Sequence, residues 1–341
     1  MKILVTGAAG YIGSHVLKQL LETTQYSIVV VDNLSTGSQK TLDRLREIRE
    51  FEFVKLDLKE FDKVATLLEE KHISIILHFA ASIVVPESVL NPLKYYMNNT
   101  LNTTNLIKCA VDSGVKKFVF SSTAAVYGEP KELPADGVDE EFFTSPINPY
   151  GVSKLMSENI LRDTAKAHPE FRFVIFRYFN VAGADIYYED NVLNPRIGQS
   201  FPNATHLIKI ASECACGKRE KMAIFGDDFD TCDGTGVRDY IHVDDLADAH
   251  VKAIEYLDYN PSDTFNVGYG KGYSVKEVIE IMQAVTDTDF TVDKEPRRAG
   301  DPAKLISNNT KISNKINWVP KYDDLKLICK SAFEWEKEVE K

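Results

Sequence analysis

Short apolar runs alternate with longer amphipathic stretches through the first half of the chain. The apolar runs contain few polar residues, and they lie at residues 2–6, 27–31, 52–56, 73–78, 117–121 and 172–177. Near-continuous apolar strands between helices are typical of a parallel sheet that is covered on both faces. The pattern therefore predicts an α/β fold with a doubly wound parallel sheet, and it places two long helices at 92–113 and 150–167.

The pattern changes after Asn180, where a polar segment with little periodicity runs from 185 to 203. Further helices are expected at 206–216, 244–257 and 274–284, and the apolar run at 264–267 is expected to return to the sheet. No linker rich in Pro or Ser separates the two halves. We therefore predict a first domain at 1–180, with returning segments near 237–270, and a smaller, interleaved C-terminal α/β substrate domain at 181–341.

The composition narrows the class of partner. The 341 residues carry a formal net charge of −11, which repels phosphate backbones and argues against a nucleic-acid partner. No apolar stretch approaches the roughly 18 residues of a membrane span, and the N-terminus does not read as a secretory signal, so we expect no membrane partner. The five cysteines have no metal-ligand spacing and predict free thiols in the cytoplasm and no metal site.

A glycine-rich loop follows the first strand. Gly7, Gly10 and Gly13 stand between that strand and a helix, where glycines allow a dinucleotide pyrophosphate to approach the helix N-terminus. Asp32 ends the second strand at the spacing expected for an acid that binds ribose hydroxyls. A carboxylate there repels a 2′-phosphate, so the loop predicts a Rossmann-type site for NAD. Asp57, after the third strand, is expected to accept a hydrogen bond from the adenine amine, although a plain loop role is the alternative.

Tyr150 and Lys154 are four residues apart at the start of a predicted helix, so they share one helical face. An ammonium near a phenol favours the phenolate, which is the form that a general base for an alcohol requires. The same spacing occurs at Tyr127 and at Tyr322, but only Tyr150 opens a long helix after a strand end. Thr123 follows that strand and is expected to contact the same substrate oxygen.

With these motifs, the chain resembles the extended short-chain dehydrogenase/reductase family, and within it the nucleotide-sugar 4-epimerases. The resemblance runs nearly end to end, and the segment at 233–243 is the most specific to the epimerases. The segments that carry it are 5–15, 32–34, 78–81, 120–128, 148–154, 177–180, 224–226, 233–243 and 297–301.

The resemblance implies interconversion of UDP-glucose and UDP-galactose by transient oxidation at C4, with an NAD that stays bound and is not consumed. It also implies a homodimer formed through the two long helices. Tyr150, Lys154 and Thr123 fall on its catalytic positions. Its cofactor contacts fall on Gly7, Gly10, Tyr11, Ile12, Gly13, Asp32, Asn33, Asp57, Leu58, Phe79, Ala80, Asn98, Tyr150, Lys154 and Phe179. Its UDP-sugar contacts fall on Thr123, Asn180, His206, Leu207, Phe225, Arg238, Arg298, Asp301 and Leu305.

Some alternatives stay open at this point. Leu305 matches a position lining the sugar pocket near C2, where a large residue excludes an N-acetyl group and a small one admits it, so 2-acetamido and uronic UDP-sugars stay open. Ile83 stands where some members carry a lysine that contacts the cofactor.

Other reactions on the same fold are less favoured. Ala124 and Ala125 replace the acidic pair of a 4,6-dehydratase, which disfavours that reaction. A cofactor-releasing reductase and a non-catalytic NAD-sensing protein are weaker alternatives. The acidic loop at 227–233 lacks the glycine of a calcium loop, so we expect a solvated or substrate-edge loop.

Overall fold

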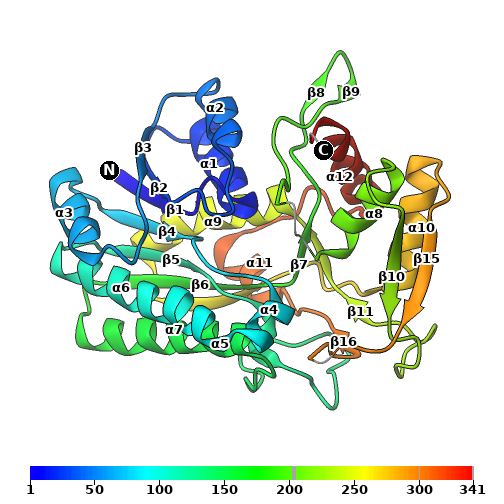
Figure 1. The fold of residues 1–341 in the computed structure, drawn as a ribbon. Helices are drawn as coiled ribbons and strands as arrows, with labels where there is room; N and C mark the ends of the chain where they lie inside the picture. Colours follow the sequence, from blue (N-terminus) through cyan, green and yellow to red (C-terminus); the bar gives the residue numbers. More distant parts are fainter. Residues whose placement is uncertain (202–204, 299, 340–341) are drawn as a thin grey trace. The chain divides into compact units, whose positions relative to one another are not determined.

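A computed structural model describes residues 1–201, 205–298 and 300–339 (Figure 1). Ala299, which belongs to the matched segment 297–301, lies outside the described residues. The chain divides into two units that alternate along the sequence. Unit 1 comprises Met1–Val126, Pro146–Arg177 and Ala247–Phe265, and unit 2 comprises Tyr127–Ser145, Tyr178–Leu246 and Asn266–Lys341. These junctions differ from the division at residue 180 that we predict from the sequence.

The sheet of unit 1 has seven strands, and it confirms the predicted doubly wound α/β class. Its order is β13-β6-β5-β4-β1-β2-β3, and every pairing from β6 to β3 is parallel. The chain order reverses between β1 and β4, and ligands of such sheets bind at the carboxyl ends beside that point. The strands are β1 (Lys2–Thr6), β2 (Ser27–Asp32), β3 (Glu52–Lys55), β4 (Ile75–His78), β5 (Lys117–Ser121), β6 (Arg172–Tyr178) and β13 (Asp263–Val267).

Helices cover the sheet because its strands are apolar on both faces. One face packs into a core with α3 (Phe61–Lys71), α6 (Asn102–Asp112) and α7 (Pro149–Ala167), in which Phe118, Leu106 and Leu161 are buried. Figure 1 shows α1 and α9 on the other side of the strands. The remaining helices of this part are α1 (Tyr11–Thr23), α2 (Gln39–Arg46), α4 (Val85–Leu90), α5 (Pro92–Tyr95) and α9 (Val243–Tyr259), with a 3-10 turn at Ala124–Tyr127.

The helix predicted at 92–113 is interrupted, and in this respect the prediction was wrong. A π-helical segment at Tyr96–Leu101 separates α5 from α6. Two asparagines of the π segment reach the loop after β4, since Asn99 Oδ1 accepts a 2.8 Å hydrogen bond from the Ser82 amide and Asn98 Nδ2 donates to Ser82 Oγ at 3.1 Å. These bonds favour a locally widened helix, a feature that is frequent at functional sites.

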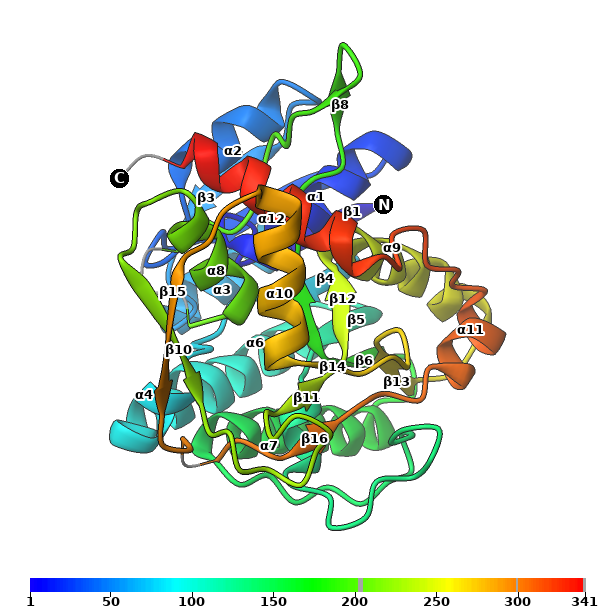
Figure 2. The same ribbon diagram turned by 90° about the vertical axis from the view of Figure 1, so that its right-hand side faces the viewer.

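Unit 2 holds several small sheets and a group of helices. Helices α8 (Leu207–Ala215), α10 (Val275–Thr286) and α12 (Leu325–Glu338) pack on one another beside β10 and β15 (Figure 2). The sequence analysis did not foresee α12 or α11 (Thr310–Ile316). The strand pairs are β7 (Asn180–Ala182) with β12 (Tyr240–His242), β8 (Tyr188–Glu189) with β9 (Val192–Leu193), β10 (Lys221–Phe225) with β15 (Thr291–Glu295), and β11 (Val237–Arg238) with both β14 (Tyr273–Ser274) and β16 (Lys304–Leu305). Across the described chain, no helix is both long and apolar enough to cross a membrane.

Candidate active site

The glycine loop at 7–13 lies between β1 and the start of α1. Gly10 is the N-cap residue of α1, and no side chain caps the helix there. Gly7 has a φ of +73°, and a Cβ at this position would lie 2.6 Å from the Ala80 amide nitrogen. A Cβ on Gly13 would lie 2.3 Å from the carbonyl oxygen of Gly7. Close backbone packing and an uncapped helix N-terminus together suit the binding of a pyrophosphate.

Asp32 lies directly beside this loop at the end of β2. Its Oδ2 accepts a 3.0 Å hydrogen bond from the Ala9 amide, and its Oδ1 accepts one of 2.8 Å from the Leu34 amide. Burial raises the pKa of this carboxyl, and the two amide hydrogen bonds act against that shift. The geometry thus puts a carboxylate next to the glycine loop, where it can accept ribose hydroxyls and would repel a phosphate.

Asp57 and Asn33 lie after β3 and β2, at the carboxyl end of the sheet where Asp32 also lies. Asn33 Nδ2 donates to Asp57 Oδ2 at 3.0 Å, and the Lys59 amide donates to Asp57 Oδ1 at 3.0 Å. Burial opposes ionisation of Asp57, but these two hydrogen bonds and the charged side chain of Lys59 together outweigh it and hold the pKa of Asp57 below its usual value. The neighbouring Leu58 is buried. These residues could hold an adenosine group.

The loop after β4 completes the candidate cofactor site of unit 1. The Phe79 amide donates to the Thr6 carbonyl at 3.0 Å, which brings Phe79 and Ala80 beside the glycine loop. Asn98 reaches this loop through Ser82 Oγ. Ile83 is exposed and offers no charge to a cofactor. Phe179, the remaining predicted cofactor contact, is a buried residue of unit 2.

The three predicted catalytic side chains of unit 1 come together at the end of β5. Tyr150 and Lys154 lie on α7, and both are almost fully buried, as is Thr123. The Thr123 side chain shares a hydrogen bond with the Tyr150 phenol. Lys154 Nζ donates to the Ser121 carbonyl at 2.8 Å. A phenol, a hydroxyl partner and an ammonium in one buried place can together move a proton to or from an alcohol.

Two features fix the start of α7 and thereby Tyr150. Asn148 is the N-cap residue, and its side chain accepts a 2.9 Å hydrogen bond from the Gly151 amide. A Cβ on Gly151 would lie 2.7 Å from the Ala125 carbonyl oxygen, so only glycine allows the helix to approach the turn after β5 this closely. The phenol of Tyr150 is thus set by a capped helix end.

The electrostatics of this group differ from the sequence-based expectation. Lys154 was expected to lower the pKa of Tyr150, but burial raises the pKa of Tyr150 to about 12, while the hydrogen bond with Thr123 acts in the lowering direction. Burial also lowers the pKa of Lys154 to about 7, against the charge of Glu158. Both shifts have the same cause, since a dry site disfavours the charged form of each group. The protein without ligands therefore favours the neutral phenol.

Two arginines of unit 2 are the predicted anion ligands. Arg238 is half-buried on β11, and its Cα pairs in register with that of Leu305 on β16. Burial lowers the pKa of Arg238, and the charge of Asp301 counteracts this. The Arg298 guanidinium stacks over the Phe225 ring at 3.5 Å. Unit 2 therefore places Arg238 beside Leu305 and Arg298 beside Phe225, and the charge of Asp301 also raises the pKa of Arg298 against its burial.

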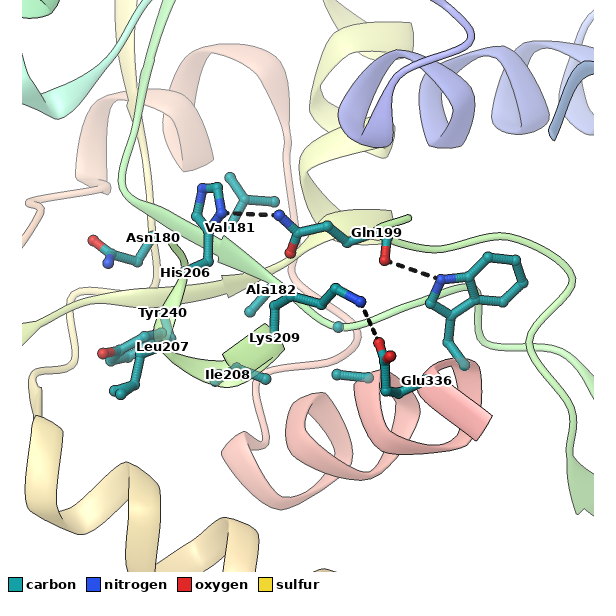
Figure 3. A pocket seen from close by; sticks show the side chains of 13 residues that line it. Asn180, Val181, Ala182, Gln199, His206, Leu207, Ile208, Lys209, Tyr240 and Glu336 are labelled. Carbon is teal, nitrogen blue, oxygen red and sulfur yellow. Dashed lines mark hydrogen bonds and ion pairs between the residues drawn. The ribbon is translucent and has the colours of Figure 1, made fainter. Parts of the chain in front are cut away.

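A second part of unit 2 forms a pocket lined by Asn180, His206 and Leu207 (Figure 3). Gln199 Nε2 lies 2.8 Å from His206 Nδ1, and the Trp335 indole donates to the Gln199 carbonyl at 3.2 Å. Burial lowers the pKa of His206, which favours the neutral imidazole. With Nδ1 accepting from the Gln199 amide, the ring carries its proton on Nε2. Sequence reasoning missed Gln199 and Trp335, because neither lies in a recognisable motif.

The acidic loop at 227–233 is tied to basic and hydroxyl side chains. Asp227 accepts from Lys294 at 2.8 Å, and Asp228 accepts from Arg297 at 2.6 Å. Asp233 accepts from Ser274 Oγ at 2.6 Å. Among the described residues, no group of His, Cys, Asp and Glu side chains is arranged to hold a metal ion. Of the two neighbouring arginines, Arg297 binds this loop, and Arg298 stacks on the Phe225 ring.

Comparisons with known proteins identify the family to which the chain is similar. A model of the NAD dependent epimerase/dehydratase family matches residues 3–268. The UDP-glucose 4-epimerase of Azospirillum brasilense is 45% identical over 99% of this chain and 93% of its own length. The solved UDP-Glc/GlcNAc 4-epimerase from Campylobacter jejuni is 57% identical, with a TM-score of 0.85 over 99% of both chains. The UDP-glucose 4-epimerase from Bifidobacterium longum, solved with NAD+ and UDP, is 36% identical, with a TM-score of 0.92 over 99% of this chain and 98% of that one.

Proposed function

The chain belongs to the NAD dependent epimerase/dehydratase family, and from this premise we propose that it interconverts UDP-glucose and UDP-galactose by inversion at C4 of the hexose. The observation that carries the proposal is the buried contact of Tyr150 with Thr123, beside Lys154, at the same sheet edge as the glycine loop. Relatives named for this activity match this chain over nearly its full length.

The residues of unit 1 fit NAD. The positive φ at Gly7, the uncapped N-terminus of α1 and the buried Asp32 suit the pyrophosphate and the adenosine ribose. Bound NAD+ supplies a hydride acceptor for C4 and a cationic ring that offsets the burial of Tyr150. We propose that the cofactor stays bound through turnover, so that the protein needs no added NAD.

The chain's own residues then handle the proton. Tyr150 removes it from the sugar 4-hydroxyl and returns it after the carbon has been inverted, and Thr123 relays it through their shared hydrogen bond. Tyr150 is therefore a phenolate before it takes this proton and a neutral phenol while C4 is oxidised, and the Lys154 ammonium stabilises the phenolate form. Because the free protein favours the neutral phenol, we expect the phenolate to form only when the positive charge of the bound cofactor adds to that of Lys154.

Unit 2 supplies the residues that we assign to the nucleotide. Arg238 and Arg298 are the proposed diphosphate ligands, because guanidinium groups give paired hydrogen bonds to phosphate oxygens. His206, as a neutral imidazole, offers an N–H donor, and Asn180 and Leu207 line the same pocket. Binding energy from the UDP group is remote from the reacting carbon, so the hexose can turn while the nucleotide stays held.

The test is a conversion assay without added NAD. The protein is incubated with UDP-glucose, UDP-galactose, UDP-N-acetylglucosamine and UDP-glucuronate separately, and products are separated by chromatography. We expect UDP-glucose and UDP-galactose to approach the same mixture from either side. If no UDP-galactose forms from UDP-glucose, although heat-denatured protein releases NAD, the proposed reaction is wrong.

We also propose that 2-acetamido sugars are substrates, because the 57% identical Campylobacter jejuni protein is a UDP-Glc/GlcNAc 4-epimerase. Leu305 is buried and in register with Arg238, and its size is compatible with an N-acetyl group near C2. The Leu305→Tyr variant is expected to lose about tenfold in kcat/KM for UDP-N-acetylglucosamine through steric exclusion, and to keep UDP-glucose conversion. An equal loss on both sugars would place Leu305 outside the C2 pocket.

We propose that the chain forms a homodimer through α5, the π segment and α7. Leu93 of α5 and Met97 of the π segment are 72% and 58% exposed, Leu90 at the end of the preceding α4 is 86% exposed, and Met156 of α7 is also exposed. An apolar stripe of this kind is costly in water and is typical of an interface.

We also propose a cytoplasmic location. All five cysteines are free thiols, which supports a reducing compartment.

Replacing Leu93 and Met97 together by Glu is expected to abolish this dimer, because charges in an apolar interface lose hydration without gaining a partner. Light scattering after gel filtration should then give the 38.4 kDa mass of one chain, where the unaltered protein gives twice that mass. Val319→Glu, at an exposed apolar residue of unit 2, is the control and should leave the mass unchanged. A monomeric unaltered protein would refute the interface.

A further inference from the structure

Three contacts within unit 1 join the end of β5 to one face of α7. The residues on the strand side are consecutive, at 121–123, and the residues on the helix side are four apart, at 150, 154 and 158. Two of the three contacts involve the proposed catalytic residues, and the third involves a side chain that has no role assigned above. The contacts are Thr123 with Tyr150, Ser121 with Lys154, and Ser122 with Glu158.

Glu158 is fully buried and fully engaged. Ser122 Oγ donates to its Oε1 at 2.5 Å, and Arg177 of β6 donates to both carboxylate oxygens, with Nη2 at 2.8 Å from Oε2. Arg162, one turn further along α7, donates to Oε2 at 2.8 Å. Burial opposes ionisation, but the hydrogen bonds and charge of Arg177, the charge of Arg162 and the hydrogen bond from Ser122 together outweigh it and hold the pKa of Glu158 below its usual value. A buried carboxylate with this many donors is costly to lose.

Apart from Glu158, the side chains around Lys154 carry little negative charge. β4 presents His78, whose pKa is lowered to about 3 by burial and by the charge of Lys154, so it is neutral. β5 presents the Phe120 ring, 4.9 Å from Lys154 Nζ, and the Ser121 carbonyl. α7 itself presents Tyr150 and Glu158. Of these groups, Glu158 alone is a permanent anion, and its charge raises the pKa of Lys154 against burial.

We propose that Glu158 is a positioning residue of the active site, whose carboxylate holds the end of β5 against α7 and keeps Lys154 in its charged form. The expected effect on the rate of UDP-glucose conversion rests on the proposed function. The expected effect on the pKa of Lys154 does not. Through Ser122 the carboxylate fixes the backbone between the Lys154 acceptor and Thr123. Through its charge it lets an ammonium persist in a dry site.

The negative charge of Glu158 decides in which direction the pH–rate profile should move when this residue is replaced. The ammonium form of Lys154 is lost as pH rises through its pKa, so the rate falls on the basic side of that pKa. Glu158→Gln removes the negative charge and lowers this pKa, which moves the basic limb of the pH–rate profile to lower pH. A shift of about one pKa unit gives about a tenfold lower rate on that limb, and a much smaller loss at low pH.

The experiment measures the pH profile of UDP-glucose conversion for the unaltered protein, Glu158→Gln and Arg162→Gln. Arg162 bonds to the same carboxylate but carries the opposite charge, so its removal should leave the basic limb in place or move it to higher pH. A purely structural role would lower the rate of both variants without moving the basic limb of Glu158→Gln to lower pH. Melting curves and NAD content confirm that each variant is folded.

A readout independent of activity is the titration of the Lys154 side chain by ¹³C and ¹⁵N NMR, assigned by comparison with Lys154→Met. If the unaltered protein converts no UDP-glucose, the proposed function fails, and this titration still tests Glu158. A Lys154 midpoint that is unchanged in folded Glu158→Gln overturns the inference. Should Glu158→Gln not fold, Arg162→Gln is titrated in its place; removing a cation beside the carboxylate should leave the Lys154 midpoint at or above that of the unaltered protein, and a lower midpoint would overturn the inference.

Discussion

Tyr150→Phe is expected to lower kcat for UDP-glucose conversion by about a thousandfold, because it removes the general base and its proton relay. The ring stays, so the buried packing beside Tyr95 and Thr123 should persist. Lys154 keeps its bond to the Ser121 carbonyl, so NAD content should be normal. The measurement is kcat by chromatography together with the NAD released from denatured protein.

Tyr95→Phe is the matched control for this variant. The Tyr95 ring lies 6.4 Å from that of Tyr150, edge to face, and its hydroxyl donates to the Val84 carbonyl and Glu87. Its loss should lower the free energy of unfolding by about 1 kcal/mol and leave kcat within a few-fold of normal. A Tyr150→Phe protein with near-normal kcat would remove the phenol from the mechanism.

The Gly7→Ala substitution is expected to abolish NAD binding and to lower the free energy of unfolding by about 3 kcal/mol. The φ of +73° strains any residue with a Cβ, and that Cβ would lie 2.6 Å from the Ala80 amide nitrogen and 2.9 Å from the Phe79 carbonyl carbon. Because both neighbours are backbone atoms of the loop after β4, relief requires the glycine loop and that loop to move apart. NAD content and urea unfolding curves give the two measurements.

Gly114 provides a control with the same backbone conformation. Its φ is +72°, but a Cβ there meets no atom within 4 Å. Gly114→Ala should therefore cost only the conformational strain, about 1 kcal/mol, and keep NAD and activity. Equal effects of the two substitutions would show that strain alone, and not the close approach of the glycine loop to Ala80, sets the requirement at Gly7.

The sequence predicts those parts of this protein that depend on local patterns. The runs at 2–6 and 117–121 became β1 and β5 because their residues are apolar throughout, and Gly7 was identified by its place between a strand and a helix. Tyr150 was distinguished from Tyr322 because only Tyr150 begins a long predicted helix that follows a strand. In the structure Tyr322 precedes α12, so it does not share a helix with Lys326.

Features that depend on contacts distant in sequence were not predicted. The π segment at Tyr96–Leu101 is favoured by bonds from Asn98 and Asn99 to Ser82, which no periodicity reveals. The pairing of Gln199 with His206 is local, but its anchor on Trp335 lies 136 residues away. The pKa of Tyr150 was expected to fall, because a spacing of four residues shows the charged neighbour but not the burial that outweighs it.

The central claim is that C4 of the hexose is inverted by moving its own hydrogen, with Tyr150 handling only the hydroxyl proton. The direct measurement is conversion of UDP-glucose in D2O without added NAD, with the UDP-galactose analysed by NMR. We predict a product that retains protium at C4, because the carbon-bound hydrogen does not exchange with solvent. Deuterium at C4 of the product would contradict the account.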